Sequence, residues 1–332
     1  MLPSKQWRRF FEGNTTMDKI IITSSRGVRK IRMQNLSPSW QPGEVSPFDL
    51  GKPYQPVARP LSLVSETPVA NSLCPLPNQL YQGDSVTLMS AWPDRFFNAC
   101  ITDPPYNIAR NRKGLSWAFS SHVTIDDNWD RFTRGEYESF TAKWLSEICR
   151  VTKENGNIFI FGSYHNIYTI GAIAAQMDLR VVNSIIWAKP NAQPNITCRM
   201  FTESTEQILW LCNNTNKNAK KWTFNYHHMK ELNNNKQMRN YWEIPLTPMR
   251  ERVHGKHPSQ KPLKLMERLV LAGTNTGDCV VDCFAGSGST LLACDRLERN
   301  WVGIERDNTY CNIAHKRIDE ERRQRRLFTA MP

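Results

Sequence analysis

From about residue 78 onward, short apolar runs rich in β-branched residues alternate with longer stretches of helical periodicity. This alternation is typical of a largely parallel sheet covered by helices on both faces. The predicted strands are 79–81, 99–102, 157–161, 180–187, 206–212, 279–282 and 301–304. The predicted helices are 137–151, 163–176, 262–273, 289–297 and 308–326. We therefore expect an α/β domain built on a mostly parallel, seven-stranded sheet.

Residues 1–76 lack this rhythm. Proline and serine recur there and apolar periodicity is weak, a composition that buries too little apolar surface to pack a core. We predict a loosely ordered, Pro/Ser-rich basic arm over 1–76 and a single domain over 77–332. The arm carries a basic cluster that fits either contact with phosphate groups or a solvated tail. This cluster consists of Arg26, Arg29, Lys30 and Arg32.

A second departure from the rhythm spans residues 190–256. The segment is rich in Asn, Lys and aromatic residues, among them Trp222, Phe224 and Tyr226. An insertion of this length in a compact α/β domain is usually functional. Amide, basic and aromatic side chains are the ones that contact phosphates and base edges. We predict that 190–256 is an inserted target-recognition region.

Composition narrows the class of protein. The net charge of +12 favours a polyanionic partner such as nucleic acid. The nine cysteines are odd in number and form no CxxC motif, so reduced thiols in the cytoplasm fit better than disulfides. No run approaches the roughly 18 apolar residues of a membrane helix. We expect no metal site, because no group of three or four candidate ligands stands out.

A glycine-rich turn follows one predicted strand, in the stretch CVVDCFAGSGST (Cys279–Thr290). The strand ends at Asp282, Gly286 and Gly288 follow, and a helical pattern begins directly afterwards. Such a turn lets the backbone approach a ligand closely at a helix N-terminus. No lysine follows the glycines, so the stretch is not a phosphate-binding P-loop. The strand-end carboxylate favours a ligand with a charged amino-acid end. Glu305 ends the next strand, where doubly wound folds bind ribose hydroxyls.

The second motif is Asp103-Pro104-Pro105-Tyr106, directly after the predicted strand 99–102. Two adjacent prolines remove two backbone donors and fix two φ angles. A carboxylate at the carboxyl end of a strand stands where doubly wound sheets bind their ligands. Taken alone, the motif fits equally well a stiff turn whose aspartate caps the next segment.

Together, DPPY and DxFxGxG resemble the motifs of amino-group DNA methyltransferases, which use S-adenosylmethionine. The order of DPPY, then HPSQKP (His257–Pro262), then the glycine-rich turn resembles the beta class. This resemblance covers about residues 79–320 and implies a Rossmann-like, circularly permuted S-adenosylmethionine-dependent methyltransferase fold. A closer likeness is to the second adenine-N6 methylase of restriction-modification systems that recognise GATC, which tolerates single-stranded DNA. It is carried by FGSYHNIYTIG, NAQPNITCRMFTESTEQILW and MKELNNNKQMRNYW.

The resemblance assigns roles to residues of both motifs. The Asp103 carboxylate and the Pro104 carbonyl would accept the N–H bonds of the base, and Tyr106 would stack on it. Asp282 would face the methionine amino group of the cofactor, and Glu305 the ribose. The full catalytic set implied is Asp103, Pro104, Pro105 and Tyr106. The cofactor set implied is Asp282, Phe284, Ala285, Gly286, Gly288, Glu305, Asp84, Lys261 and Pro262.

Several alternatives stay open at this point. Cytosine-N4 transfer uses the same motifs, although that group more often has Ser where Asp103 stands. An RNA base methyltransferase also fits, because the same four residues serve amino groups of RNA bases. A non-catalytic nucleic-acid-binding protein is disfavoured by two intact motifs. The implied partner is DNA, double- or single-stranded. The sequence leaves open a cognate restriction endonuclease and a homodimer.

Overall fold

The computed structural model describes residues 20–24, 27–31, 73–107, 132–195, 198–214 and 221–329. Its contacts divide the chain into two units, Met1–Val57 and Ala58–Pro332. In the first unit, β1 (Ile20–Ser24) and β2 (Gly27–Ile31) form an antiparallel hairpin that the sequence pattern does not predict. Most of the remaining arm lies outside the described residues, so its loose order stays a prediction.

One eight-stranded sheet organises the second unit, in the order β3-β10-β9-β4-β5-β7-β6-β8. The strands are β3 (Gln79–Gln82), β4 (Phe97–Thr102), β5 (Thr152–Gly162), β6 (Arg180–Ala188), β7 (Thr205–Cys212), β8 (Tyr241–Glu243), β9 (Cys279–Asp282) and β10 (Asn300–Glu305). Neighbours from β3 to β5 run parallel, and β7 runs antiparallel to β5 and β6. All seven predicted strands are present, and β8 is an additional edge strand. The predicted mostly parallel α/β fold is confirmed.

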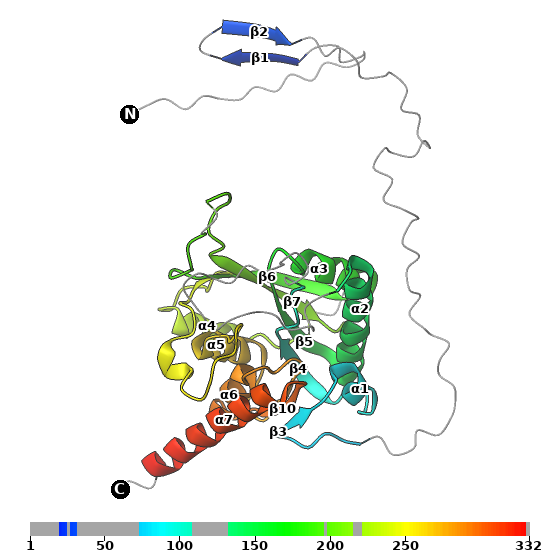
Figure 1. The fold of residues 1–332 in the computed structure, drawn as a ribbon, viewed down its shortest axis with the longest axis vertical. Coiled ribbons are helices and arrows are strands. Elements are labelled where there is room, and N and C mark those ends of the chain that lie inside the picture. Colours follow the sequence, from blue (N-terminus) through cyan, green and yellow to red (C-terminus); the bar gives the residue numbers. More distant parts are fainter. Residues whose placement is uncertain are drawn as a thin grey trace, which may run out of the picture. The chain divides into compact units, whose positions relative to one another are not determined.

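Helices cover both faces of this sheet (Figure 1). The first three pack in sequence on one face, and the other four on the opposite face. They are α1 (Ser85–Ser90), α2 (Arg134–Val151), α3 (Ile167–Gln176), α4 (Tyr226–Leu232), α5 (Leu263–Gly273), α6 (Ser289–Arg296) and α7 (Asn308–Thr329). The sequence pattern predicts five of them and misses α1, α4 and the short 3₁₀ helix η3 (Met249–Glu251). Within the described part of the chain, no helix has the length and apolar character to cross a membrane.

Strand β5 shows why the central strands read as continuous apolar runs. Its residues Ile158, Phe159, Ile160 and Phe161 are all fully buried. Ile158 and Ile160 belong to the core beneath α1–α3, whereas Phe159 and Phe161 belong to the core beneath α5–α7. A strand buried on both faces has no solvent side on which polar residues alternate. Two apolar cores therefore hold the strands that carry the motifs.

The two motif strands, β4 and β9, are neighbours in the sheet, with Cys100 opposite Val281. From β9 the chain continues into α6, which belongs to one helical layer. From β4 it reaches α2, which belongs to the other layer. Neighbouring strands whose connections leave toward opposite faces create a crevice at their carboxyl ends, where open α/β sheets bind ligands. Both motifs follow these strand ends.

Candidate active site

Two carboxylates far apart in the sequence meet at this crevice. Asp103 follows β4 and Asp282 ends β9. A hydroxyl joins the strand ends, because Thr102 Oγ1 donates to Asp282 Oδ1 over 2.9 Å. The sheet therefore brings DPPY and the glycine-rich turn together, as the sequence predicts.

Within the described part of the chain, two acceptors of the DPPY corner have no hydrogen-bond partner. Asp103 Oδ1 is buried and receives no hydrogen bond from the described residues. No donor in the described part of the chain reaches the Pro104 carbonyl either. The Pro105 carbonyl is different, because the hydroxyl of Tyr137 on α2 donates to it over 2.8 Å and anchors the corner. Two adjacent acceptors are thus left for an incoming N–H donor.

The ammonium group of Lys261 holds the other oxygen of Asp103. Lys261 Nζ lies 2.6 Å from Asp103 Oδ2, 3.2 Å from Glu206 Oε2 and 3.3 Å from Tyr106 Oη. Tyr106 donates its hydroxyl to Glu206 Oε2 over 3.0 Å. Lys189 Nζ lies 3.2 Å from Glu206 Oε1. We name Asp103, Lys189, Glu206 and Lys261 the charge cluster, which pairs two carboxylates with two ammonium groups.

The charge cluster differs from the sequence prediction in two ways. The resemblance implies a cofactor contact for Lys261, whereas its ammonium lies on the DPPY corner; Pro262, directly after it, is the N-cap of α5. Lys189 and Glu206 are not predicted as site residues at all. Their only signal is a charge at the end of an otherwise apolar strand, and such a charge is usually solvated.

Burial and ion pairing have opposite effects on the pKa values of groups in the charge cluster. Burial raises the pKa of Asp103, and the ammonium of Lys261 offsets only part of this rise. Burial also opposes the charged forms of Lys261 and Glu206, but their opposite charges outweigh it, so the pKa of Lys261 is raised and the pKa of Glu206 is lowered. Burial and the two carboxylates raise the pKa of Tyr106 well above its usual value. Lys261 and Glu206 therefore stay ionised, and Tyr106 keeps its proton.

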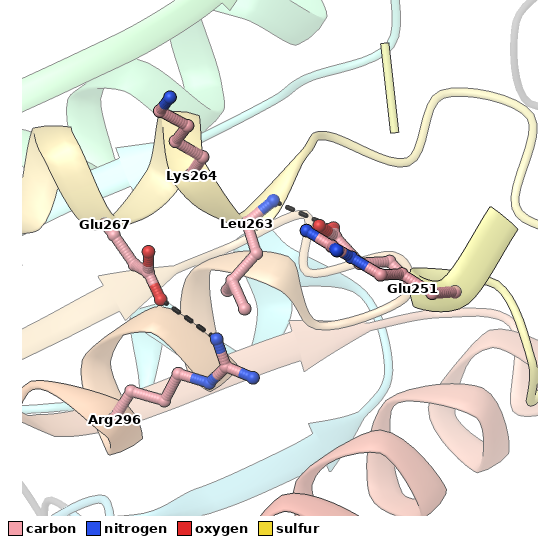
Figure 2. Close-up of a pocket in the computed structure, with 6 residues that line it drawn as sticks. Glu251, Leu263, Lys264, Glu267 and Arg296 are labelled. Carbon is pink, nitrogen blue, oxygen red and sulfur yellow. Dashed lines mark hydrogen bonds and ion pairs between the residues drawn. The ribbon is translucent and has the colours of Figure 1, made fainter. Parts of the chain in front are cut away.

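A network around η3 fixes the turn that carries Lys261. The Glu251 carboxylate accepts from the backbone N–H of Leu263 over 2.9 Å, at the start of α5 (Figure 2). Gln260 Nε2 donates to the Glu251 carbonyl over 2.8 Å, and Ser289 Oγ donates to the Lys261 carbonyl over 2.9 Å. The cavity drawn in Figure 2, of about 530 Å³, contains none of the predicted site residues. Two of its lining residues, Glu251 and Leu263, form the hydrogen bond that helps to fix the turn before α5.

The glycine-rich turn closes against the HPSQKP stretch. Gly286 and Gly288 have φ angles of 51° and 74°, which glycine adopts without steric cost. A Cβ atom on Gly286 would lie 2.9 Å from His257 Nε2. Burial lowers the pKa of His257 to about 3, so the imidazole packed there is neutral. The Ala285 N–H donates to the Ile304 carbonyl over 2.8 Å, which fixes the turn to β10.

Asp282 lies deeper than the sequence suggests. The residue is 3% exposed, and both carboxylate oxygens accept hydrogen bonds. The Phe284 N–H donates to Oδ1 over 3.1 Å, and Thr290 Oγ1 donates to Oδ2 over 2.5 Å. Burial raises the pKa of Asp282 to about 7 despite these bonds. The Phe284 ring packs edge-on against Trp144 of α2. Contact between Asp282 and a cofactor amino group stays a prediction.

Glu305 and Asp84 lie at the same end of the sheet. Glu305 Oε2 accepts from the Gly286 N–H over 2.8 Å, and burial raises the pKa of Glu305. The Gly83 N–H donates to the Glu305 carbonyl over 2.9 Å, which brings the start of α1 to the end of β10. Asp84 is exposed and caps α1, accepting from the Thr87 N–H over 2.9 Å. Both residues thus flank the glycine-rich turn.

Arg317 on α7 supports this turn, and the sequence reasoning misses it. Its Nη1 donates to the Ser287 carbonyl over 2.6 Å and to Ser289 Oγ over 3.1 Å. The residue is 5% exposed, and burial lowers its pKa to about 10. The helical spacing of the sequence does indicate its burial, because Arg317 lies on the same face of α7 as the buried residues Ala314 and Ile318.

Comparison with known proteins gives matches to DNA methylases over most of the chain. A family model described as DNA methylase, of the N6/N4 type, matches residues 97–316. The type II methyltransferase M2.DpnII of Streptococcus pneumoniae is 39% identical over 244 residues, which cover 73% of this chain and 90% of that protein. M2.MboI of Moraxella bovis is 35% identical, with 73% and 87% covered.

Solved structures share the fold. A complex of M1.HpyAVI with S-adenosylmethionine is 26% identical, with a TM-score of 0.52, and covers 72% of this chain and 98% of that one. The cytosine-N4-specific PvuII DNA methyltransferase is 18% identical, with a TM-score of 0.58 and coverages of 74% and 87%. The predicted family resemblance is confirmed. This chain belongs to the N6/N4 family of DNA methylases.

Proposed function

We propose that the protein transfers the methyl group of S-adenosylmethionine to the N6 amino group of adenine in DNA, within the sequence GATC. The observation that carries this proposal is the pair of unfilled acceptors at the DPPY corner, Asp103 Oδ1 and the Pro104 carbonyl. An exocyclic amino group has two N–H bonds, so each acceptor can receive one of them.

These two hydrogen bonds prepare the nitrogen for attack. Its lone pair is delocalised into the base ring, which makes the amino group a poor nucleophile. Acceptors at Asp103 and Pro104 draw the nitrogen toward a tetrahedral shape and direct the lone pair at the methyl carbon. Acceptors fixed before the reaction lower the barrier by several kcal/mol. The proton leaves after attack, when the nitrogen is cationic, and Asp103 is the nearest base to accept it.

The residues around the glycine-rich turn fit S-adenosylmethionine, which supplies a methyl group on a positively charged sulfonium. The carboxylates of Asp282 and Glu305 both have a raised pKa and gain from a cationic or hydroxyl partner. We place the methionine amino group near Asp282, the ribose near Glu305 and the adenine near Asp84. The turn over Phe284–Gly288 would lie against the cofactor.

The target base must leave the helix stack or arrive unpaired, because its amino group is buried in a duplex. Tyr106, held by Glu206, offers a ring on which the base stacks. The region 190–256 would read the DNA sequence. Within it, Arg199 is exposed and Phe201 is 96% exposed. Lys189 precedes and Glu206 follows the loop that carries both residues, so this loop begins and ends at the charge cluster.

The choice of adenine and of GATC rests on sequence resemblance. Asp103, rather than the Ser more frequent in cytosine-N4 enzymes, favours adenine. The stretches that resemble the second methylase of GATC systems lie in or beside residues 190–256. The relatives M2.DpnII and M2.MboI carry the designation of second methyltransferases in their names.

We place the protein in the cytoplasm, beside a restriction endonuclease of the same specificity. None of the nine cysteines, all of which lie among the described residues, forms a disulfide, which suits a reducing compartment. The name type II methyltransferase, shared by the relatives, supports a restriction partner. A homodimer stays a prediction from the sequence.

The proposal is tested by incubating the protein with labelled S-adenosylmethionine and a GATC-containing duplex, then digesting the DNA to nucleosides. We expect the label in N6-methyl-2′-deoxyadenosine. Label in N4-methyl-2′-deoxycytidine would identify the cytosine alternative. Label that passes into a competing RNA of the same sequence instead of the DNA would identify an RNA methyltransferase.

A further inference from the structure

We infer that Glu206 is a positioning residue for methyl transfer, because its carboxylate fixes both the Tyr106 ring and the Lys261 ammonium. This inference rests on the proposed function. Glu206 Oε2 accepts the Tyr106 hydroxyl over 3.0 Å and lies 3.2 Å from Lys261 Nζ. Neither contact is needed for the fold of β7 itself, which is held by its backbone pairing with β5 and β6.

Glu206 is itself held rigidly. It pairs with Trp187 across the antiparallel β6–β7 ladder, and Lys189 follows β6 and reaches Glu206 Oε1 over 3.2 Å. The side chains of Glu206 and Lys189 are 14% and 10% exposed, so solvent screens their attraction little. A site mounted on strands is more precise than a site mounted on loops. The backbone pairing of β6 with β7 therefore restricts the position of Glu206.

The contact with Tyr106 sets the stacking surface. The Tyr106 ring follows two prolines, which fix the backbone but leave the side-chain torsions of Tyr106 free. The hydrogen bond to Glu206 removes that freedom at the far end of the ring. A target base arriving at Asp103 would therefore find the aromatic face already oriented.

The contact with Lys261 keeps one oxygen of Asp103 available. An ammonium group has three hydrogens to donate. The Lys261 ammonium donates them to Asp103 Oδ2, Tyr106 Oη and the Ser259 carbonyl, over 2.6, 3.3 and 3.4 Å. With these acceptors in place, no hydrogen is left for Asp103 Oδ1, which has no partner among the described residues. The negative charge of Glu206, 3.2 Å from Lys261 Nζ, holds the ammonium in this position, so that it leaves free the oxygen that the substrate amino group needs.

The test compares Glu206→Gln with Glu154→Gln, a matched substitution at an exposed position near the start of β5. Single-turnover methylation of a GATC duplex should slow by about tenfold or more in Glu206→Gln, as expected for a misplaced reacting group. The Kd for S-adenosylmethionine should stay within about twofold of the unaltered protein. Glu154→Gln should match the unaltered protein in both measurements.

Two further readouts separate positioning from a general structural role. With 2-aminopurine at the target position, Glu206→Gln should give brighter fluorescence at saturating protein, because the flipped base stacks less well. The acidic limb of the single-turnover pH profile should move to lower pH, because Glu206 contributes to the raised pKa of Asp103. Tyr106→Phe, which keeps the charge cluster, should reproduce the brighter fluorescence but leave the acidic limb closer to its original position.

An unaltered rate and pH profile in Glu206→Gln would overturn the inference while leaving the proposed function standing. If Glu206→Gln does not fold, Tyr106→Phe decides: unchanged 2-aminopurine fluorescence and an unchanged rate overturn the inference. Absence of methylation by the unaltered protein would overturn the proposed function itself.

Discussion

At the scale of single residues, the chemistry depends on what each carboxylate oxygen of Asp103 contacts. One oxygen is held by Lys261, and the other is buried and has no partner in the described part of the chain. A buried carboxylate without a cation nearby would take up a proton. It would then lose its negative charge and part of its capacity to accept hydrogen bonds. Lys261 therefore has a role at the reacting end of the site, in addition to or instead of the cofactor contact that the motif resemblance implies.

Substituting Lys261→Met separates these two roles. Because the ammonium lowers the pKa of Asp103, its removal should raise that pKa further. The carboxylate would then be protonated at higher pH, and the acidic limb of the single-turnover profile should move upward. Lys261→Arg keeps the cation and should hold the limb near its original position. A limb that stays in place in Lys261→Met, together with a large loss of S-adenosylmethionine affinity, would favour the cofactor role.

Neither Lys189 nor Glu206 could be recognised from the sequence. Each is one charge at the end of an apolar strand. The two meet only when β6 and β7 pair, which places Glu206 against the Tyr106 hydroxyl. By contrast, Asp103 and Asp282 were predictable, because each follows or ends a strand with a distinctive turn after it. Residues with local motif chemistry can be found from a sequence, whereas tertiary charge pairs cannot.

At the scale of elements, the glycine-rich turn and the HPSQKP stretch form one unit. Their contact is close enough that a Cβ atom on Gly286 would lie 2.9 Å from the His257 ring. Arg317 supports the turn from α7, and Glu251 supports the stretch from η3. Cofactor binding should therefore depend on the fit between the two segments as well as on direct contacts.

The pair Gly286→Ala and Gly277→Ala tests this dependence. Both glycines have positive φ, 51° and 82°, so both substitutions carry a backbone cost of about 1 kcal/mol. Only Gly286 meets another side chain, because a Cβ on Gly277 has no neighbour within 4 Å. We expect Gly286→Ala to weaken S-adenosylmethionine binding by tenfold or so in calorimetry, and Gly277→Ala to leave it unchanged. Equal affinities in the two variants would contradict the fit between turn and stretch.

The helices and strands differ in how readily the sequence pattern predicts them. Seven strands were predictable because their apolar runs are buried on one or both faces, as in β5. Strand β8 has only three residues, of which Trp242 alone is buried, so it leaves no periodic signal. Helix α1 has six residues and is marked mainly by its cap Asp84, which the family resemblance interprets as a cofactor contact. Short elements depend on tertiary partners that the sequence does not display.

At the scale of the whole molecule, the site lowers the stability of the fold that carries it. Asp282 is buried with a pKa of about 7, well above the usual 3.8 of its side chain. The folded state therefore holds a proton that the unfolded state releases between about pH 4 and pH 7. The contribution of Asp282 to stability is complete below pH 4 and is lost as the pH rises through 7. Such a cost is common at functional sites.

Replacing Asp282 by Asn should reveal this cost. The amide cannot ionise, and Thr102 and Thr290 can still exchange hydrogen bonds with it. We expect a higher Tm at pH 8 and a smaller gain at pH 5, measured by thermal unfolding. Affinity for S-adenosylmethionine should fall in the same variant if Asp282 meets the methionine amino group. A lower Tm at pH 8 than the unaltered protein would contradict the destabilising role of the ionised carboxylate.

Adenine-N6 methylation within GATC by the DPPY acceptor pair can be tested by mapping methylated bases at single-nucleotide resolution on a duplex that contains one GATC and one GTAC. We expect N6-methyladenine at the adenine of GATC, none at GTAC, and none at either site with Asp103→Ala, which should still bind S-adenosylmethionine. Methylation of cytosine, equal methylation of both sites, or near-normal activity of Asp103→Ala would contradict it.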